Sequence, residues 1–290
     1  MMYIIKQAIE IFLKIIPTSI ALKIGRGRIK ISRHLPANIE TQIDYYYGDF
    51  RVNIDTKYPI EREMISGKYS PDLINVLETV ICPGDICFDI GANIGALTLV
   101  MAKLTGDSGI VYSFEPNQIV FQRLLTNIDL NKLKNVVPIK LGLGEKNENL
   151  GLYISNCDPG NAGLTRGSIY NELIEVTSLD LFINSKSIEK LDFMKVDVEG
   201  MEYSVFIGGQ KTLQTHRPTI IFETLKDRRE KRRQEGKDLY ENMEIFLKRL
   251  GYLLFRIEQN GTYIETSLKE TSEDTLAIHR TRKLILRKIS

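Results

Sequence analysis

The feature of this sequence that most constrains its fold is a regular alternation of strand-length apolar runs with longer helical patterns. The apolar runs lie at 86–90, 109–115, 135–143, 191–198 and 217–223. Apolar residues at helical spacing occupy the intervals 94–104 and 117–131. Apolar runs of this length indicate parallel strands buried on both faces, and right-handed crossovers through the helices then produce a doubly wound sheet. A ligand of such a sheet binds outside the carboxyl ends of the strands.

Further elements flank this alternation, beginning with a short β-rich stretch near residues 45–55. Ser70 and Pro71 have the residue types of an N-cap and a first helical residue, so they predict the start of a helix. Asn117 is expected to cap the helix at 117–131. The remaining elements that we expect are a helix from Glu199 to about Leu213, a helix at 242–250, and strands at 252–257 and 275–279.

Residues 144–190 depart from the alternation. Two strand-like pieces, "NLGLYI" and "LIEVTSLD", flank a polar loop that is rich in glycine. This pattern predicts a β insertion between the third and fourth strands of the sheet. We therefore expect two parts: residues 1–68 form an N-terminal helical and β extension, and residues 69–290 form the main α/β domain with its insertion.

The first 33 residues predict an amphipathic helix followed by a basic tail. Apolar residues from Ile5 to Ile16 fall near one helical face, but charged residues and Pro17 interrupt the run. It is too short for a transmembrane helix, and no cleavage site of the signal-peptide type follows it. We favour a helix that packs on the domain or on a second subunit over one that lies on an anionic membrane surface. A homodimer and a peripheral membrane contact both stay open.

Composition narrows the partners and the compartment. The chain of 290 residues has a net charge of +2, too small to indicate nucleic-acid binding, and its basic block at 226–237 is mixed with acidic residues. Three cysteines without a C-x-x-C pair indicate neither a disulfide framework nor a structural zinc site. We expect Cys82 and Cys87 to be small core residues in a reducing compartment. The prediction is a cytoplasmic protein, with a position at the membrane periphery left open.

The stretch "CFDIGANIGALTL", residues 87–99, places an acid and a glycine-rich turn between a predicted strand and a predicted helix. Its glycine spacing, Gly91 to Gly95, does not match the G-x-G-x-x-G pattern of dinucleotide-binding turns. Asp89 at the end of the strand would repel a diphosphate but attract an ammonium or sulfonium group. The turn therefore suits S-adenosylmethionine, which carries both cationic groups, and Asn93 offers an amide to its carboxylate.

A second acid, Glu115, ends the next predicted strand in "VYSFEPN". An acid at this position can accept hydrogen bonds from both hydroxyls of a cofactor ribose, as in dinucleotide-binding folds. The combination of Asp89, the glycine turn and Glu115 indicates S-adenosylmethionine more specifically than any one of these features alone.

Four segments, "FDIGANIG", "VYSFEPN", "LDFMKVDVEGMEYSVFIGG" and "RPTIIFE", occur in this order within the span from Tyr69 to Glu223. On these segments the chain resembles the FkbM-type methyltransferase family of S-adenosylmethionine-dependent O-methyltransferases. The resemblance implies a class I, Rossmann-like fold: a doubly wound, mostly parallel seven-stranded sheet whose last strand is antiparallel. It also implies methyl transfer to a hydroxyl of a sugar, glycolipid or natural product.

The expected cofactor site combines the glycine turn, the end of the second strand and two further positions. By resemblance, Tyr69 closes over the amino acid end of the cofactor. The stretch "LGLGE" is expected to pass the adenine at the end of the third strand. The full set is Tyr69, Asp89, Gly91, Ala92, Asn93, Gly95, Glu115, Pro116, Asn117 and Gly142.

The stretch "KVDVEG" supplies the candidate catalytic residues at the end of the fourth strand. Asp197 is our candidate for the general base or for the group that orients the acceptor hydroxyl. Glu199 either assists Asp197 or complements the dipole of the following helix, and Glu202 is expected to do the latter. Lys195 is expected to pair with a carboxylate rather than to act on the substrate.

The acceptor is expected to bind under the loop at 155–170, because loops above the carboxyl edge of a sheet set specificity. The candidate residues there are Asn161, Thr165 and Arg166, with Glu223 at the end of the fifth strand facing the same side. Asp197, Glu199 and Glu223 could hold Mg²⁺, but three carboxylates around a cleft are common without a metal, and no metal is predicted.

Three functions stay in competition. The leading one is an O-methyltransferase that acts on a saccharide, glycolipid or other natural-product hydroxyl. A nicotinamide-dinucleotide oxidoreductase is disfavoured by the missing glycine pattern and by the charge of Asp89. A methyltransferase-fold scaffold without activity would be expected to have lost Asp89, Glu115 or Asp197, and all three are present.

Overall fold

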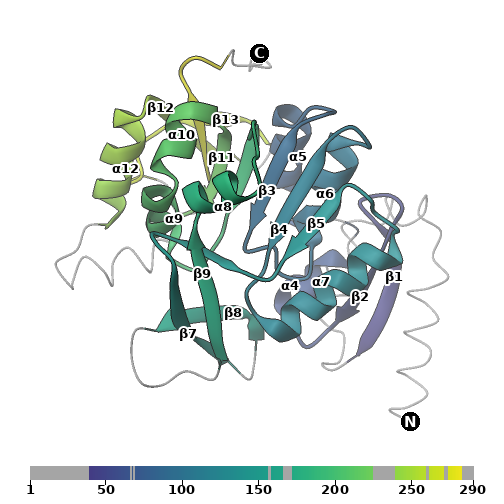
Figure 1. Cartoon of the computed structure of the whole chain (residues 1–290). Coiled ribbons are helices and arrows are strands. Elements are labelled where there is room, and N and C mark those ends of the chain that lie inside the picture. The colour runs from purple at the N-terminus through teal and green to yellow at the C-terminus, as the bar shows by residue number, and fades with distance from the viewer. Residues whose placement is uncertain are drawn as a thin grey trace, which may run out of the picture.

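The computed structural model describes residues 39–65, 67, 69–155, 158–165, 172–224, 239–258, 261–270 and 274–282. A twisted eight-stranded sheet forms its centre, with helices on both faces and a smaller sheet below (Figure 1). From one edge to the other, the strands are β13 Tyr263–Glu265, β12 Tyr252–Ile257, β14 Asp274–His279, β11 Thr219–Glu223, β10 Phe193–Val196, β3 Ile86–Ile90, β4 Ile110–Phe114 and β5 Val136–Ile139.

The directions of the strands confirm the predicted doubly wound, mostly parallel sheet. Strands β11, β10, β3, β4 and β5 pair in parallel, whereas β14 is antiparallel to both β11 and β12. The last strand, β14, is therefore antiparallel, as expected, and the short β13 also pairs antiparallel with β12. The expected count of seven strands is one too few, because the short segment Tyr263–Glu265 adds to the edge of β12. A three-residue edge strand carries too little apolar pattern to be predicted.

Two hydrophobic clusters sandwich the sheet. The helices α5 Pro71–Val80, α6 Ala96–Thr105 and α7 Gln118–Leu130 cover one face. The helices α8 Leu179–Ser185, α9 Glu202–Gly208, α10 Gln210–His216 and α12 Leu239–Arg249 cover the other. Successive strand residues, such as Cys87 and Phe88, belong to opposite clusters, which is the period of two expected of a strand with both faces buried.

One predicted helix start is confirmed, and two differ from the prediction. Asn117 caps α7, since its side-chain oxygen accepts hydrogen bonds from the backbone amides of Ile119 and Val120. Ser70 precedes α5 as predicted, but its φ is +45° and its side chain makes no capping hydrogen bond. The expected helix from Glu199 to Leu213 is two helices, and Glu199 lies in the turn before them. The break falls at Gly209, where a Cβ atom would meet the Leu179 side chain at 2.5 Å.

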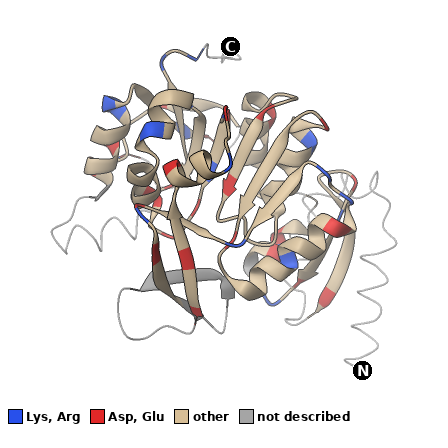
Figure 2. Ribbon diagram, viewed as in Figure 1, with Lys and Arg blue, Asp and Glu red and all other residues tan. Residues whose placement is uncertain are grey.

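The predicted β insertion is a separate four-stranded sheet between β5 and α8. Its strands are β6 Gly142–Gly144, β9 Glu172–Ser178, β7 Glu148–Ser155 and β8 Asp158–Thr165, in that order. The expected strand at 135–143 is thus divided between two sheets, ending as β5 and resuming as β6. One face of the insertion buries Leu150, Leu152, Ile174 and Val176, while acidic residues mark β7 and β9 (Figure 2).

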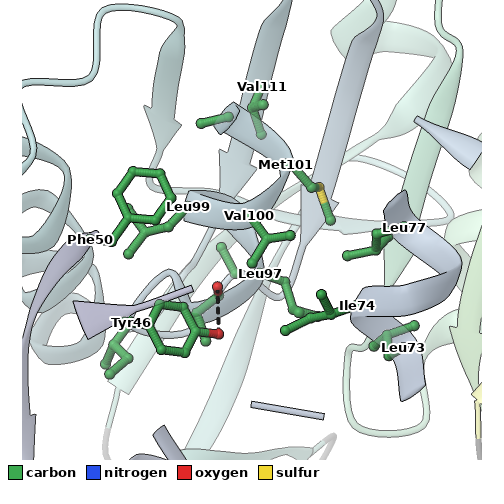
Figure 3. Packing of buried hydrophobic residues seen from close by; sticks show 14 of the residues in the cluster. Tyr46, Phe50, Leu73, Ile74, Leu77, Leu97, Leu99, Val100, Met101 and Val111 are labelled. Carbon is green, nitrogen blue, oxygen red and sulfur yellow. Dashed lines mark hydrogen bonds between the residues drawn. The ribbon is translucent and has the colours of Figure 1, made fainter. Parts of the chain in front are cut away.

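The N-terminal hairpin packs into the core of the main sheet. It consists of β1 Glu40–Tyr46 and β2 Phe50–Asp55, and the short helix α4 Pro59–Met64 follows it. Side chains of the hairpin pack with α5 and α6, and the hydroxyl of Tyr46 donates a hydrogen bond of 3.0 Å to the carbonyl of Ala96 (Figure 3). The helix predicted within residues 1–33 lies outside the described residues, and the expected domain limits stay a prediction.

Two smaller predictions are also decided. Cys87 is buried in β3 as expected, but Cys82 is exposed in the turn before it, so the prediction for Cys82 was wrong. Cys82 follows directly on an apolar run, which favoured a buried position, but it already belongs to the solvent-exposed turn. Among the described residues, no helix is both long and apolar enough to cross a membrane.

Candidate active site

A cavity lies at the carboxyl ends of β3, β4 and β10, where a doubly wound sheet binds its ligand. It encloses about 1030 Å³ of space outside protein atoms, part of it open to solvent. The insertion sheet supplies one of its walls through β6, β7 and β9. The predicted residues that line the cavity are Tyr69, Gly91, Ala92, Asn93, Glu115, Pro116, Gly142, Asp197 and Glu199.

The turn after β3 is held by its own backbone. The amides of Gly91 and Ala92 donate hydrogen bonds of 3.0 and 2.8 Å to the carbonyl of Phe114 at the end of β4. Gly91 has a φ of +81°, and a Cβ atom there would lie 1.9 Å from the carbonyl oxygen of Asp197. Glycine is therefore required at this position both by the backbone angle and by the close approach of the chain after β10.

Glu115 points its carboxylate into this turn. Its two oxygens accept hydrogen bonds of 3.0 Å from the backbone amides of Asn93 and Asn117. Burial raises the pKa of the Glu115 carboxyl to about 7, although both hydrogen bonds oppose the shift. A carboxylate oxygen can accept more than one hydrogen bond, so each oxygen retains capacity for a hydroxyl donor in the cavity.

Asp89 lies deeper than its predicted role requires. Its side chain is fully buried, accepts a hydrogen bond of 2.6 Å from the Thr98 hydroxyl, and is not among the groups that line the cavity. Burial raises the pKa of the Asp89 carboxyl, and Lys195 and Thr98 offset part of that shift. The Asp89 carboxyl group is therefore buried outside the cavity lining.

Lys195 pairs with carboxylates, as the sequence indicated. Its ammonium group lies 3.1 Å from Oδ2 of Asp197 and 3.8 Å from Oδ1 of Asp89. Asp197 itself lies directly after β10, and its side chain is about one-third exposed at 32%. The structure thus brings the candidate catalytic carboxylate and the cofactor turn to one edge of the cavity.

Three further acids lie close to Asp197, and they differ in role. Glu202 lies in the first turn of α9, where it was expected to complement the helix dipole, and it also holds the preceding loop by accepting hydrogen bonds from the amides of Val198 and Gly200. Glu199 has a φ of +56° and lines the cavity. Glu223 ends β11 without lining the cavity; burial and the neighbouring Asp197 carboxylate raise its pKa to about 8.

Not every predicted site residue reaches the cavity. Gly95 and Asn117 belong to the starts of α6 and α7 and do not line it. Asn161 and Thr165 lie in β8, and Arg166 lies outside the described residues. Within the described part of the chain, no group of three or more His, Cys, Asp or Glu residues is arranged to hold a metal ion.

Sequence reasoning missed most of the apolar wall of the cavity. Ile60 comes from α4, Leu141 and Leu143 flank Gly142, and Leu152, Ile174 and Val176 come from the insertion. Apart from Leu141, which lies between β5 and β6, each is an ordinary apolar residue of a strand or helix. The expected passage of "LGLGE" beside the adenine already indicated Leu141 and Leu143, and the predicted position of the insertion could have found Leu152, Ile174 and Val176; no sequence signal pointed to Ile60.

The sheet order, the antiparallel last strand and the cavity at the strand ends define a class I methyltransferase fold of the Rossmann type. The model of the methyltransferase FkbM domain matches residues 89–254, more than half of the chain, so the protein belongs to this family. The resemblance inferred from the sequence is confirmed.

Individual relatives match only part of the chain. The hexuronic acid methyltransferase AglP of Haloferax volcanii is 30% identical over 152 residues, which cover 52% of this chain and 60% of that protein. Methyltransferase 1 of Beauveria bassiana is 28% identical over 141 residues, covering 41% of this chain and 56% of that one. The matched region thus spans less than two thirds of either relative.

Solved structures give a weaker likeness. The methyltransferase FkbM from Methylobacillus flagellatus aligns with a TM-score of 0.44 and 17% identity, covering 75% of this chain and 52% of that chain. The TYW2 protein of M. jannaschii, solved in complex with AdoMet, aligns with a TM-score of 0.43 and 14% identity, covering 84% of this chain and 87% of that chain.

Proposed function

We propose that this protein is an S-adenosylmethionine-dependent O-methyltransferase that acts on a hydroxyl group of a sugar, glycolipid or other natural product. The observation that supports it most directly is the charge of the cavity. Glu115, Asp197 and Glu199 line it, and the lining Lys195 is already paired with Asp89 and Asp197. A net negative lining favours a cationic ligand and disfavours a diphosphate.

The residues present fit this cofactor. Glu115 would accept hydrogen bonds from the ribose hydroxyls, and the turn at Gly91 to Asn93 would pass the amino acid end. Leu141, Leu143 and Val176 offer apolar surface for the adenine ring. When bound, the cofactor supplies an electrophilic methyl group.

Asp197 is the proposed partner of the acceptor hydroxyl. Lys195 engages its Oδ2 atom, so Oδ1 would accept the hydroxyl proton or orient the hydroxyl for in-line attack. The name of AglP supports a saccharide acceptor, because that relative is a hexuronic acid methyltransferase. A nicotinamide-dinucleotide oxidoreductase and an inactive scaffold are the alternatives, and both predict no methyl transfer.

Two substitutions separate cofactor binding from chemistry. Asp89→Ala is expected to abolish S-adenosylmethionine binding in titration calorimetry, because it removes the negative charge behind the turn and leaves Lys195 without one of its partners. Asp197→Ala is expected to retain binding and to lose turnover, measured as transfer of labelled methyl groups to sugars, uronic acids and lipid extracts.

Asp49→Ala is the matched control, since this exposed carboxylate pairs with Lys103 far from the cavity. It should leave both quantities unchanged. Undiminished cofactor binding by Asp89→Ala, with the fold intact by circular dichroism, would contradict the cofactor assignment. Binding of NADH in place of S-adenosylmethionine would favour the oxidoreductase.

A further inference from the structure

Lys195 is a buried cation whose position the proposed reaction does not by itself explain. Only 7% of it is exposed, and it lies in the middle of the sheet, on β10. In the parallel pairing of β10 with β3, Lys195 stands directly opposite Asp89. An ammonium group in such a place is retained only with close partners, because burial without them is costly.

The partners of Lys195 come from two different parts of the site. Its ammonium donates a hydrogen bond of 3.1 Å to the carbonyl of Gly91, in the turn after β3. It also lies 3.1 Å from Oδ2 of Asp197, beyond the end of β10. A single side chain therefore contacts both the cofactor turn and the proposed catalytic carboxylate.

We infer that Lys195 is a positioning residue, which fixes the Asp197 carboxylate relative to the turn that binds the cofactor. This inference rests on the proposed function and deepens it. The Lys195 ammonium has two acceptors at 3.1 Å, the Gly91 carbonyl and Asp197, and the Asp89 carboxylate lies further off at 3.8 Å as a charge partner.

The backbone geometry supports the same link. The carbonyl of Asp197 occupies the space where a Cβ atom of Gly91 would be, so the two chain segments are already in contact. That contact fixes the main chain of Asp197, but not the rotation of its side chain. Lys195 supplies the missing restraint by holding one carboxylate oxygen, which leaves the other to the acceptor hydroxyl.

A simpler role for Lys195 would be to neutralise Asp89. Although burial lowers the pKa of Lys195, the Asp197 and Asp89 carboxylates raise it overall, so the group stays charged beside both acids. The distances favour positioning, since Asp197 and Gly91 lie closer to the ammonium than Asp89 does. The two roles make opposite predictions once Asp89 has lost its charge.

The test compares Lys195→Met, Asp89→Asn and the double variant with the wild type. For the wild type and Lys195→Met, calorimetry gives the dissociation constant of S-adenosylmethionine, and methyl transfer at saturating cofactor gives kcat with the sugar that the wild type accepts. We expect Lys195→Met to lower kcat about 100-fold, the typical effect of a misplaced reacting group, and to weaken cofactor binding much less. Lys195→Arg should recover part of the turnover.

The double variant decides between the two roles. A positioning residue predicts that Lys195→Met loosens the Asp197 side chain in the Asp89→Asn background as well, as three-bond NMR couplings to the Asp197 Cγ atom would show in the cofactor-free protein. If these couplings are the same in the double variant as in Asp89→Asn alone, Lys195 only neutralises Asp89, and the inference is overturned. Lys190→Met is the matched control, because this exposed lysine pairs with Asp192 near the opposite end of the same strand.

A second readout needs no acceptor. The rotation of the Asp197 side chain can be followed in the cofactor-free protein by three-bond NMR couplings to its Cγ atom. Lys195→Met should average these couplings toward those of a freely rotating side chain, whereas Lys190→Met should leave them unchanged. Unchanged couplings in Lys195→Met would overturn the link even if no acceptor is found, whereas a wild type without cofactor binding or methyl transfer would count against the proposed function alone.

Discussion

The turn after β3 and the insertion sheet form two walls of one cavity, but they are built in different ways. The turn is fixed by backbone hydrogen bonds, a glycine that no other residue can replace, and buried charges at defined distances. The insertion is fixed by four buried apolar side chains. The comparison teaches that the turn demands particular residues, whereas the wall formed by the insertion demands only apolar ones.

The largest effect is expected at the turn. Gly91→Ala combines a left-handed backbone angle with a Cβ atom 1.9 Å from the Asp197 carbonyl, so it should lower the free energy of unfolding by about 4 kcal/mol. Urea denaturation measures this. Gly106→Ala is the control, since its φ is +61° and its ψ −173° but nothing lies within 4 Å of a Cβ atom there, so it should cost about 2 kcal/mol from backbone strain alone. Equal urea midpoints for the two variants would contradict the claim that the turn requires glycine because of the close approach of Asp197.

A smaller and more local effect is expected in the insertion. Ile174→Ala removes a side chain that is 4% exposed in the four-residue cluster, and should cost about 2 kcal/mol. Hydrogen exchange should then rise in β7 and β9 and stay unchanged in β3 and β10. Leu173→Ala, at the neighbouring exposed position, should change stability by less than about 0.5 kcal/mol. Faster exchange throughout the main sheet would show that the two walls are one cooperative unit.

The smallest effect concerns the charge at Glu115. Its pKa of about 7 means that the carboxylate is lost as the pH falls through neutrality. If the carboxylate binds the cofactor ribose, affinity for S-adenosylmethionine should be about tenfold weaker near pH 6 than near pH 8, by proton linkage. Glu115→Gln should flatten this profile. The same profile in both proteins would assign the pH dependence to another group.

The contribution of Glu115 to the free energy of unfolding is expected to depend on pH in the opposite direction to its contribution to cofactor affinity. Because burial raises the pKa of the Glu115 carboxyl in the folded protein above its ordinary value of 4.5, the protonated carboxyl favours the folded state at low pH. That contribution is lost as the pH rises from about 4.5 to about 7. The cofactor-free Glu115→Gln variant should therefore lose less stability over this range than the wild type, as thermal unfolding at several pH values would show.

The parts of the site that the sequence predicted are those where physics restricts the residue. Gly91 and Glu115 follow from a backbone angle and from an acid at a strand end, and both line the cavity. The apolar wall escaped prediction because Ile60, Leu152 and Ile174 meet only through the tertiary fold. Two further contacts could not be predicted from local sequence. Lys195 reaches Gly91 because of the strand register, and the buried Asp89 accepts a hydrogen bond from Thr98 of α6.

The fold shows the same division. Apolar runs and capping residues predicted the parallel strands and the helix after Asn117. The β13 strand and the break at Gly209 were not predicted, because one depends on an edge pairing and the other on the approach of Leu179. Local pattern thus determined the elements, and contacts distant in sequence determined where they end.

The hydrogen bond of the Tyr46 hydroxyl bears on which segment of the chain would have to be transferred together with this site. The hydroxyl joins the hairpin to the first residue of α6 through a hydrogen bond of 3.0 Å to the carbonyl of Ala96. The family match begins only at residue 89. If natural or engineered recombination exchanged only the matched segment, the turn after β3 and helix α6 would be separated from the hairpin that packs against them. A transferable version of this site would therefore have to include the hairpin, which precedes the motifs by which the family is recognised.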